Sequence, residues 1–169
     1  MADQLRHIKM GLVAFVSALS AFFGWYGWIV IMWISLMVID WITGSLAAHR
    51  NGTWESSKGR DGIRHKFGCI VVVLTAGVLD IVIGLLIDRI PNIGFNYSVA
   101  MSLVVLIWYI LTEMGSIIEN AGKLGAPIPN FLAKGIKALN HKVTTFGESM
   151  TGEFEDDAKG NDNTEKNVK

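Results

Sequence analysis

Long apolar stretches dominate the chain, and four can be drawn, at residues 8–24, 27–47, 67–87 and 97–118. The last three have roughly the 20 residues that a helix needs to cross the hydrocarbon core of a bilayer, and the first, at about 17, is at the short limit. We therefore expect an all-α membrane protein with four transmembrane helices, of which the first is the shortest.

The uncharged run from Met10 to Ile39 needs a break. As one straight helix it would be about 45 Å long, against a hydrocarbon core of about 30 Å. Gly24 and Gly27 permit a turn, and the aromatic residues around them suit the membrane–water interface. Two alternatives exist for the first segment, a cleaved secretory signal peptide and a helix that inserts reversibly, and neither changes the orientation of the other three spans.

Polar sequence follows the last apolar stretch. Residues 119–130 contain two prolines and two glycines and predict a link that stops the fourth helix. Apolar residues then recur at threes and fours among lysines up to about 147, which predicts a cytoplasmic amphipathic helix. It would lie on the inner leaflet or pack on the loop or another subunit. We expect a membrane domain (1–118), this linker with its helix (119–147) and a disordered charged tail (148–169).

Composition supports a membrane protein, because 51% of the residues are hydrophobic and mean hydropathy is +0.39. The 15 basic and 15 acidic residues balance, so net charge indicates no nucleic-acid partner. With four spans, 14 of the 15 basic residues fall on one side of the membrane. Both termini should then be cytoplasmic. The cations expected to set this topology in the second loop are Arg50, Lys58, Arg60, Arg64 and Lys66.

Three acids, Asp40, Asp80 and Glu113, lie within apolar stretches that hold no lysine or arginine. Each must therefore be protonated, hydrogen-bonded to a hydroxyl or the backbone, or in contact with water. Asp40 and Glu113 either mark the cytoplasmic ends of their spans or, like Asp80, line an interface or pore. Small residues form two stripes that predict close helix packing. They are Gly11, Ala14, Ala18 and Ala21 on the first span and Gly77 and Gly84 beside Asp80.

Catalytic patterns are weak. The four histidines match no metal-ligand spacing, and no phosphate-binding or dinucleotide-binding loop occurs. An intramembrane enzyme using Asp40 and Glu113 is an alternative without a nucleophile or metal partner. We therefore expect no enzyme, no catalytic residue, no metal and no cofactor.

Two ordered motifs carry a family resemblance. The first is "DWITG" at Asp40, continued by "AA", Gly52, "SSKG", Gly62 and Lys66, and the second is "E..SIIEN....G.PIP..L" from Glu113 to Leu132. Together they resemble the phage-lysis and toxin-secretion holin family over more than half of the chain. The matching positions are Asp40, Thr43, Gly44, Ser56, Lys58, Gly59, Gly62, Lys66, Glu113, Glu119, Asn120, Pro127 and Pro129.

The resemblance implies a multi-pass protein of the bacterial host's cytoplasmic membrane, encoded by a phage or prophage. Its partners would be other copies of itself, the lipid bilayer and an endolysin that crosses the lesions they open. Toxin secretion is the alternative within the family. A small ion channel or transporter subunit and an assembly or scaffold protein are the alternatives outside it.

Overall fold

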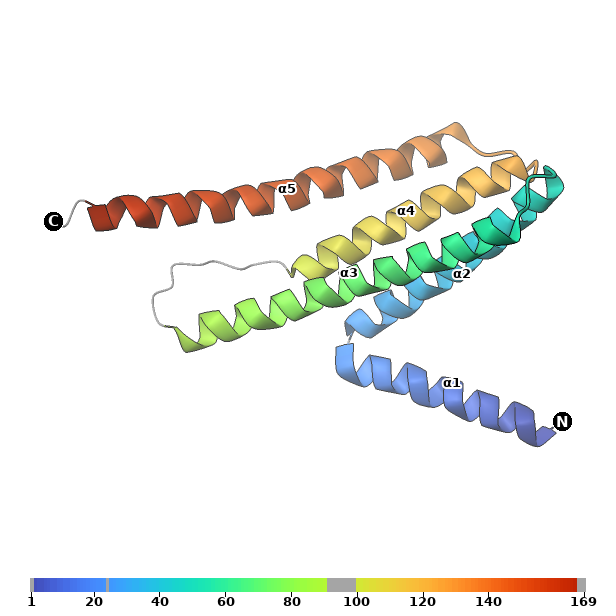
Figure 1. The fold of residues 1–169 in the computed structure, drawn as a ribbon, viewed down its shortest axis with the longest axis horizontal. Coiled ribbons are helices and arrows are strands. Elements are labelled where there is room, and N and C mark those ends of the chain that lie inside the picture. The colour runs from blue at the N-terminus through green and yellow to red at the C-terminus, as the bar shows by residue number, and fades with distance from the viewer. Residues whose placement is uncertain (1, 24, 91–99, 167–169) are drawn as a thin grey trace.

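Five α-helices make up almost all of the protein (Figure 1). The computed structural model describes residues 2–23, 25–90 and 100–166, with side chains at 5–18, 27–57, 59–90 and 100–152. The helices are α1 (Ala2–Phe23), α2 (Trp25–Arg50), α3 (Ser56–Arg89), α4 (Met101–Lys123) and α5 (Asn130–Lys166). No strand occurs in these ranges, which confirms the all-α prediction.

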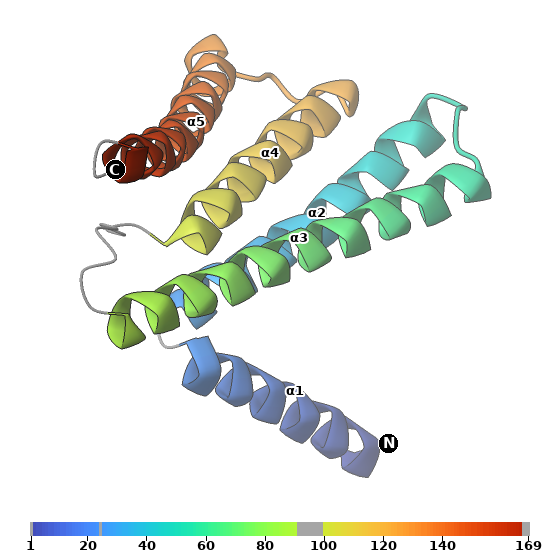
Figure 2. The same ribbon diagram turned by 60° about the vertical axis from the view of Figure 1, so that its left-hand side comes forward.

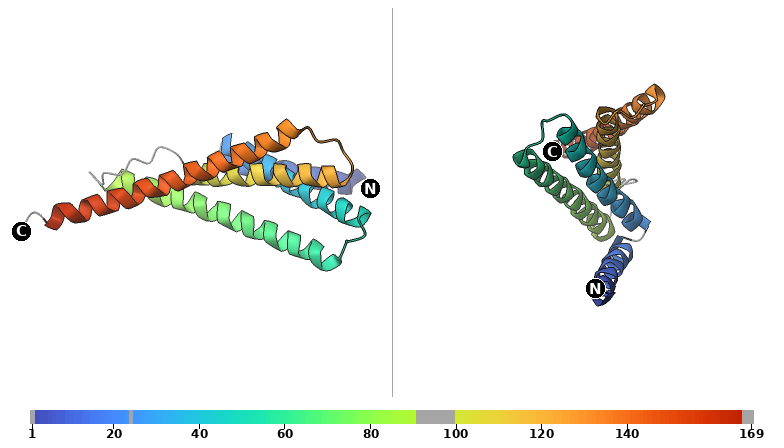
Figure 3. Two further views of the ribbon diagram at one scale, coloured as in Figure 1. Left: turned by 90° about the horizontal axis from the view of Figure 1, so that it is seen from above. Right: turned by 90° about the vertical axis from the view of Figure 1, so that its right-hand side faces the viewer.

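Helix α4 is the centre of the arrangement, because it contacts α2, α3 and α5. Figures 1 and 3 show α2, α3 and α4 running side by side, while α1 contacts α2 and then diverges from the bundle (Figure 2). The core lies where α2, α3 and α4 meet. Its buried members are Trp33, Met37, Cys69, Leu106 and Ile110.

In the described part of the chain, three helices are long and apolar enough to cross a membrane: Gly27–Arg50, Gly59–Arg89 and Met101–Lys123. They correspond to the last three predicted spans, although residues 97–99 of the fourth lie outside the described ranges. The outward faces suit lipid, since large apolar side chains such as Phe67 and Val78 are 67% and 59% exposed. The first apolar segment forms α1 but is not among these three helices, so its membrane span stays a prediction.

The break in the first apolar run is confirmed and is narrower than expected. Helix α1 ends at Phe23 and α2 begins at Trp25, so only Gly24 separates them. Gly24 itself lies outside the described residues. The second glycine, Gly27, is buried inside α2.

The expected glycine-broken basic loop between the second and third spans is much shorter than predicted. Helix α2 continues to Arg50 and α3 starts at Ser56, leaving a five-residue turn in which Gly52 has φ +67°. Gly59 and Gly62 lie within α3, and a Cβ added at Gly62 would be 3.8 Å from Trp41 Cδ1 of α2, an ordinary contact distance. Trp41 Nε1 donates to Gly59 O at 3.4 Å. Close helix packing therefore compensates for the low helix propensity of glycine.

The disordered tail predicted for 148–169 is wrong over residues 148–166, where α5 continues as helix to Lys166. The segment contains no proline, and adding turns to an existing helix costs far less than nucleating a new one. The predicted link at 119–130 is also shorter, because α4 continues to Lys123 and Gly125, at φ +91°, turns the chain before α5 starts at Asn130.

One end of the bundle holds the α2–α3 turn and the α4–α5 link, and the start of the diverging α1 points to the same side (Figure 1). These are the segments that the distribution of lysine and arginine predicts to be cytoplasmic. Helix α5 then returns alongside α4, so its C-terminal end lies at the opposite end of the bundle (Figures 1 and 3). The orientation of the bundle in a membrane, including both termini, stays a prediction.

Candidate functional site

A partly buried lysine joins three helices near the α2–α3 turn. Lys66 Nζ of α3 donates to Asp40 Oδ2 of α2 at 2.9 Å and to Glu113 Oε2 of α4 at 2.6 Å. The exposed fraction of these side chains is 15% for Lys66, 19% for Asp40 and 8% for Glu113. Among the described residues, Glu113 is the one buried charged residue. The three helices are therefore linked by one desolvated ion cluster.

One neutral side chain, Asn120, completes the hydrogen bonding of the Asp40 carboxylate and also contacts Thr43. Asn120 Nδ2 of α4 donates to Asp40 Oδ1 at 3.0 Å and to Thr43 Oγ1 at 3.4 Å. Thr43 Oγ1 in turn donates to the backbone carbonyl of Ile39 at 2.9 Å. We refer to Asp40, Thr43, Lys66, Glu113 and Asn120 as the polar cluster. Both carboxylate oxygens of Asp40 are thus occupied, as buried charges require.

Helical spacing brings these residues together. Asp40, Thr43 and Gly44 are separated by three and one residues on α2, and Glu113 and Asn120 by seven on α4, so each set shares one helix face. A Cβ added at Gly44 would lie 3.3 Å from Asn120 Nδ2, tighter than an ordinary contact. Gly44 therefore permits the close approach of α2 and α4 at this level.

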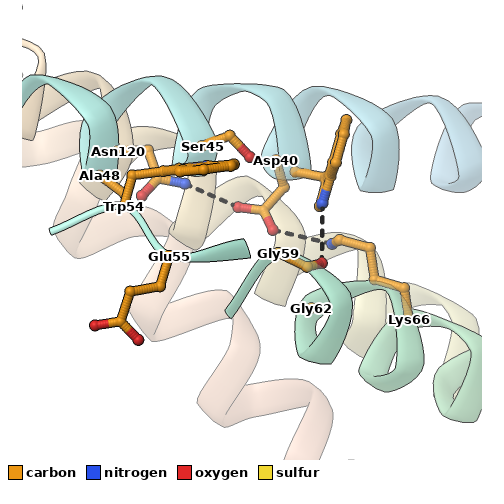
Figure 4. Close-up of a pocket in the computed structure, with 11 residues that line it drawn as sticks. Asp40, Ser45, Ala48, Trp54, Glu55, Gly59, Gly62, Lys66 and Asn120 are labelled. Carbon is orange, nitrogen blue, oxygen red and sulfur yellow. Dashed lines mark hydrogen bonds and ion pairs between the residues drawn. The ribbon is translucent and has the colours of Figure 1, made fainter. Parts of the chain in front are cut away.

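The polar cluster borders a cavity of about 190 Å³ (Figure 4). Asp40 and Lys66 form one side of it, while Trp41 and Trp54 contribute aromatic surface. In Figure 4 the Asp40 carboxylate lies between Asn120 and Lys66, and Glu55 points away from it. With one ammonium between two carboxylates, the ionised cluster carries a net charge of −1. Its geometry fits a structural role, in which the ion pairs hold α2, α3 and α4 together.

Asp80 has a separate role at the opposite end of the bundle. Its Oδ1 accepts the backbone N–H of Met101 at 2.8 Å and its Oδ2 that of Ser102 at 2.9 Å. These are the first two residues of α4, whose own N-cap, Ala100, offers no side-chain hydrogen bond. Asp80 of α3 therefore caps α4 and complements the positive end of its dipole. Of the options that the sequence left open for this acid, the structure favours backbone hydrogen bonding at a helix interface.

Replacing Asp80 by alanine is expected to lower the free energy of unfolding by about 1–2 kcal/mol, because two backbone N–H groups of α4 lose their acceptor. The matched control is Asp88→Ala, an exposed acid on the same helix. Unfolding of the purified protein in detergent measures both changes. Equal losses for the two variants would contradict the capping role.

Comparison with known proteins identifies the chain by its sequence. A model of the bacteriophage holin family matches residues 17–141, which include α2, α3, α4 and the whole polar cluster. The chain belongs to the bacteriophage holin family. The holin resemblance inferred from the two motifs is therefore confirmed.

The curated relatives of this holin-family chain match it over nearly their full length. Protein BH0965 of Halalkalibacterium halodurans is 30% identical over 132 residues, which are 78% of this chain and 93% of the relative. A 14.9 kDa protein encoded in the nagH 3′ region of Clostridium perfringens is 30% identical over 142 residues, 84% of this chain and 99% of the relative. Both are described as uncharacterized. No solved structure matches the chain.

The structure brings eight of the thirteen holin-motif positions to the polar cluster and its cavity. They are Asp40, Thr43, Gly44, Gly59, Gly62, Lys66, Glu113 and Asn120. Ser56 starts α3, Pro127 and Pro129 lie in the α4–α5 link, and Glu119 is exposed on α4. The side chain of Lys58 lies outside the described set. The two sequence motifs therefore meet in space.

The loop cations divide into different environments. Lys66 lies within α3 and belongs to the polar cluster rather than to a loop, while its part in setting the topology stays a prediction. Arg50 Nη1 donates to the backbone carbonyl of Leu124 and ties the α2–α3 turn to the α4–α5 link. Arg64 forms an exposed pair with Asp61, and Arg60 is exposed. The sequence analysis assigned Lys66 to the loop and therefore missed it as the ion-pair partner of Asp40 and Glu113. The available signal was its position directly before a span, at the end where the other two spans carry these acids.

The small-residue stripes do not mediate packing within the described part of one chain. Nothing lies within 4 Å of a Cβ added at Gly11, Gly77 or Gly84. Ala14 and Ala18 are exposed, and the side chain of Ala21 falls outside the described set. Packing of these stripes between copies stays a prediction.

Proposed function

We propose that this chain is a phage or prophage holin that oligomerises in the host cytoplasmic membrane and opens lesions through which an endolysin reaches the cell wall. The observation that carries the proposal is the family match, which spans all three membrane-candidate helices and the polar cluster. The apolar outer faces of these helices and the small-residue stripes left open in one copy support assembly in lipid.

The polar cluster supports a controlled rather than a constitutive lesion. It holds α2, α3 and α4 of one subunit together and hides two membrane acids from lipid. A subunit can therefore accumulate as a closed bundle, and the lesion forms by association of bundles. Asp40 and Glu113 then serve the packing of each subunit rather than the lumen.

Lysis provides the direct test. The chain is expressed in a bacterial host with a wall hydrolase that lacks an export signal, and culture turbidity and release of a large cytoplasmic enzyme are recorded. We expect abrupt clearing and enzyme release only when both proteins are present. Expression of the hydrolase alone and of the chain alone are the controls.

Other results would favour the alternative functions. Depolarisation without passage of a folded protein indicates a small ion channel or transporter subunit, and neither depolarisation nor lysis indicates a scaffold. Within the holin family, transport of a large toxin in place of the hydrolase, without clearing, would indicate toxin secretion.

A further inference from the structure

Helix α5 is docked on a helix that is long and apolar enough to cross the membrane. Trp108 Nε1 of α4 donates to Thr144 Oγ1 at 3.0 Å, and Asn140 Nδ2 of α5 donates to Thr112 Oγ1 at 3.1 Å. Ile136 of α5 is buried. A Cβ added at Gly147 would lie 3.6 Å from Val104 Cγ1. Specific polar and apolar contacts therefore hold α5 along α4.

These contacts lie at the middle of the α4 span. Trp108 and Thr112 are about 11 and 17 Å from the start of a helix about 34 Å long. If α4 crosses the bilayer, residues 140–144 of α5 lie near its midplane. Helix α5 is itself too polar to be among the membrane-candidate helices found in the described residues.

One exposed face of α5, about a quarter turn from the residues that contact α4, carries ionisable side chains. The rest of its exposed surface includes large apolar side chains such as Phe131, which is 78% exposed. Lys134, Lys137, His141 and Glu148 are spaced as i, i+3, i+7 and i+14, so they share one helix face, and each is exposed. Lipid solvates such a face very poorly, and ionisable groups at membrane depth face the bundle interior or water. The docked position of α5 is therefore compatible with a membrane-spanning α4 only where water reaches this face.

We propose that α5 lines the aqueous lumen of the assembled lesion, docked on α4 as in this structure, with its face of Lys134, Lys137, His141 and Glu148 toward water. This inference rests on the proposed function, since the lumen exists only in the assembly. Helix α4, which contacts α2, α3 and α5, then lies between α5 and the two apolar helices that face lipid.

Thiol modification at His141 tests the inference. The purified chain carrying Cys69→Ala and His141→Cys is reconstituted in liposomes, and a membrane-impermeant methanethiosulfonate is added while the liposomes release a trapped folded protein. We expect the thiol to be modified, because it would stand at mid-depth in the water-filled lumen. The matched control, Val78→Cys in the same background, places the thiol on the apolar face of α3, where the side chain is 59% exposed, and should stay unmodified. An unmodified His141→Cys thiol in leaking liposomes would overturn the inference.

A reversible cross-link gives a second test. Cysteines at Val104 and Gly147, in the Cys69→Ala background, are within reach of a disulfide that fixes α5 on α4. We expect the oxidised protein to conduct as well as the reduced one. Conductance that is lost on oxidation and restored on reduction would overturn the inference, because α5 would then have to leave α4, for example for the inner leaflet. If the wild-type chain never conducts, the proposed function fails instead.

Discussion

The Lys66→Met variant is expected to lose about 3–5 kcal/mol of the free energy of unfolding, because two carboxylates are left desolvated without their cation. Lys66 donates to Asp40 at 2.9 Å and to Glu113 at 2.6 Å. The loss should appear as a lower unfolding midpoint of the purified protein in detergent, and as poor accumulation in the membrane.

Arg64→Met is the matched control, since Arg64 lies two residues away on the same helix. Its pair with Asp61 joins side chains that are 77% and 67% exposed, so removing it should change stability by no more than about 0.5 kcal/mol. A triple variant, Lys66→Met with Asp40→Asn and Glu113→Gln, removes every charge of the cluster and should regain most of the stability. Equal effects of the two single variants, or no recovery in the triple variant, would contradict the ion-cluster interpretation.

Trp33→Ala should lower the free energy of unfolding by about 3–5 kcal/mol, because it empties the centre of the packing between α2, α3 and α4. Trp33 is 1% exposed, and its ring centroid lies 5.7 Å from that of Tyr109. Its Nε1 is buried with no hydrogen-bond partner in the described part of the chain. Trp33→Phe, which keeps much of the volume and removes that buried donor, should therefore cost clearly less than the alanine variant.

Trp28→Ala tests whether this loss comes from packing. Trp28 lies on the same helix and is 62% exposed, so its removal leaves no cavity between helices. Detergent unfolding curves of Trp33→Ala, Trp33→Phe and Trp28→Ala should rank the three in that order of decreasing loss. Comparable losses at Trp28 and Trp33 would show that the core around Trp33 does not carry the stability of the bundle.

The helices that depend on a local hydrophobic pattern were predictable from the sequence. Three apolar stretches, the break at Gly24 and the amphipathic start of α5 follow from hydrophobic runs and spacing, which need only neighbouring residues. Helix ends were less predictable. Gly59 and Gly62 are typical of a loop in isolation, yet both are helical here, and Trp41 of α2 donates a hydrogen bond to Gly59 O.

The polar cluster could not be derived from local pattern. Lys66 is separated from Asp40 by 26 residues and from Glu113 by 47, and only the packing of three helices brings them together. The same holds for Asp80, whose carboxylate oxygens accept hydrogen bonds from backbone N–H groups 21 and 22 residues further along the chain. The holin motifs marked Asp40, Lys66, Glu113 and Asn120 as a set but did not show that they touch.

The polar cluster also has a consequence for biogenesis. Asp40 leaves the ribosome before Lys66, and Glu113 follows both, so the acid of α2 reaches the insertion machinery before its partner has been made. An unpaired charge at the centre of a span costs about 2.5–3.5 kcal/mol on insertion scales. Insertion of α2, α3 and α4 into the bilayer as a group avoids that cost. A chain truncated between Arg50 and Lys66 should therefore be retained by the insertion machinery or degraded rather than anchored in the membrane.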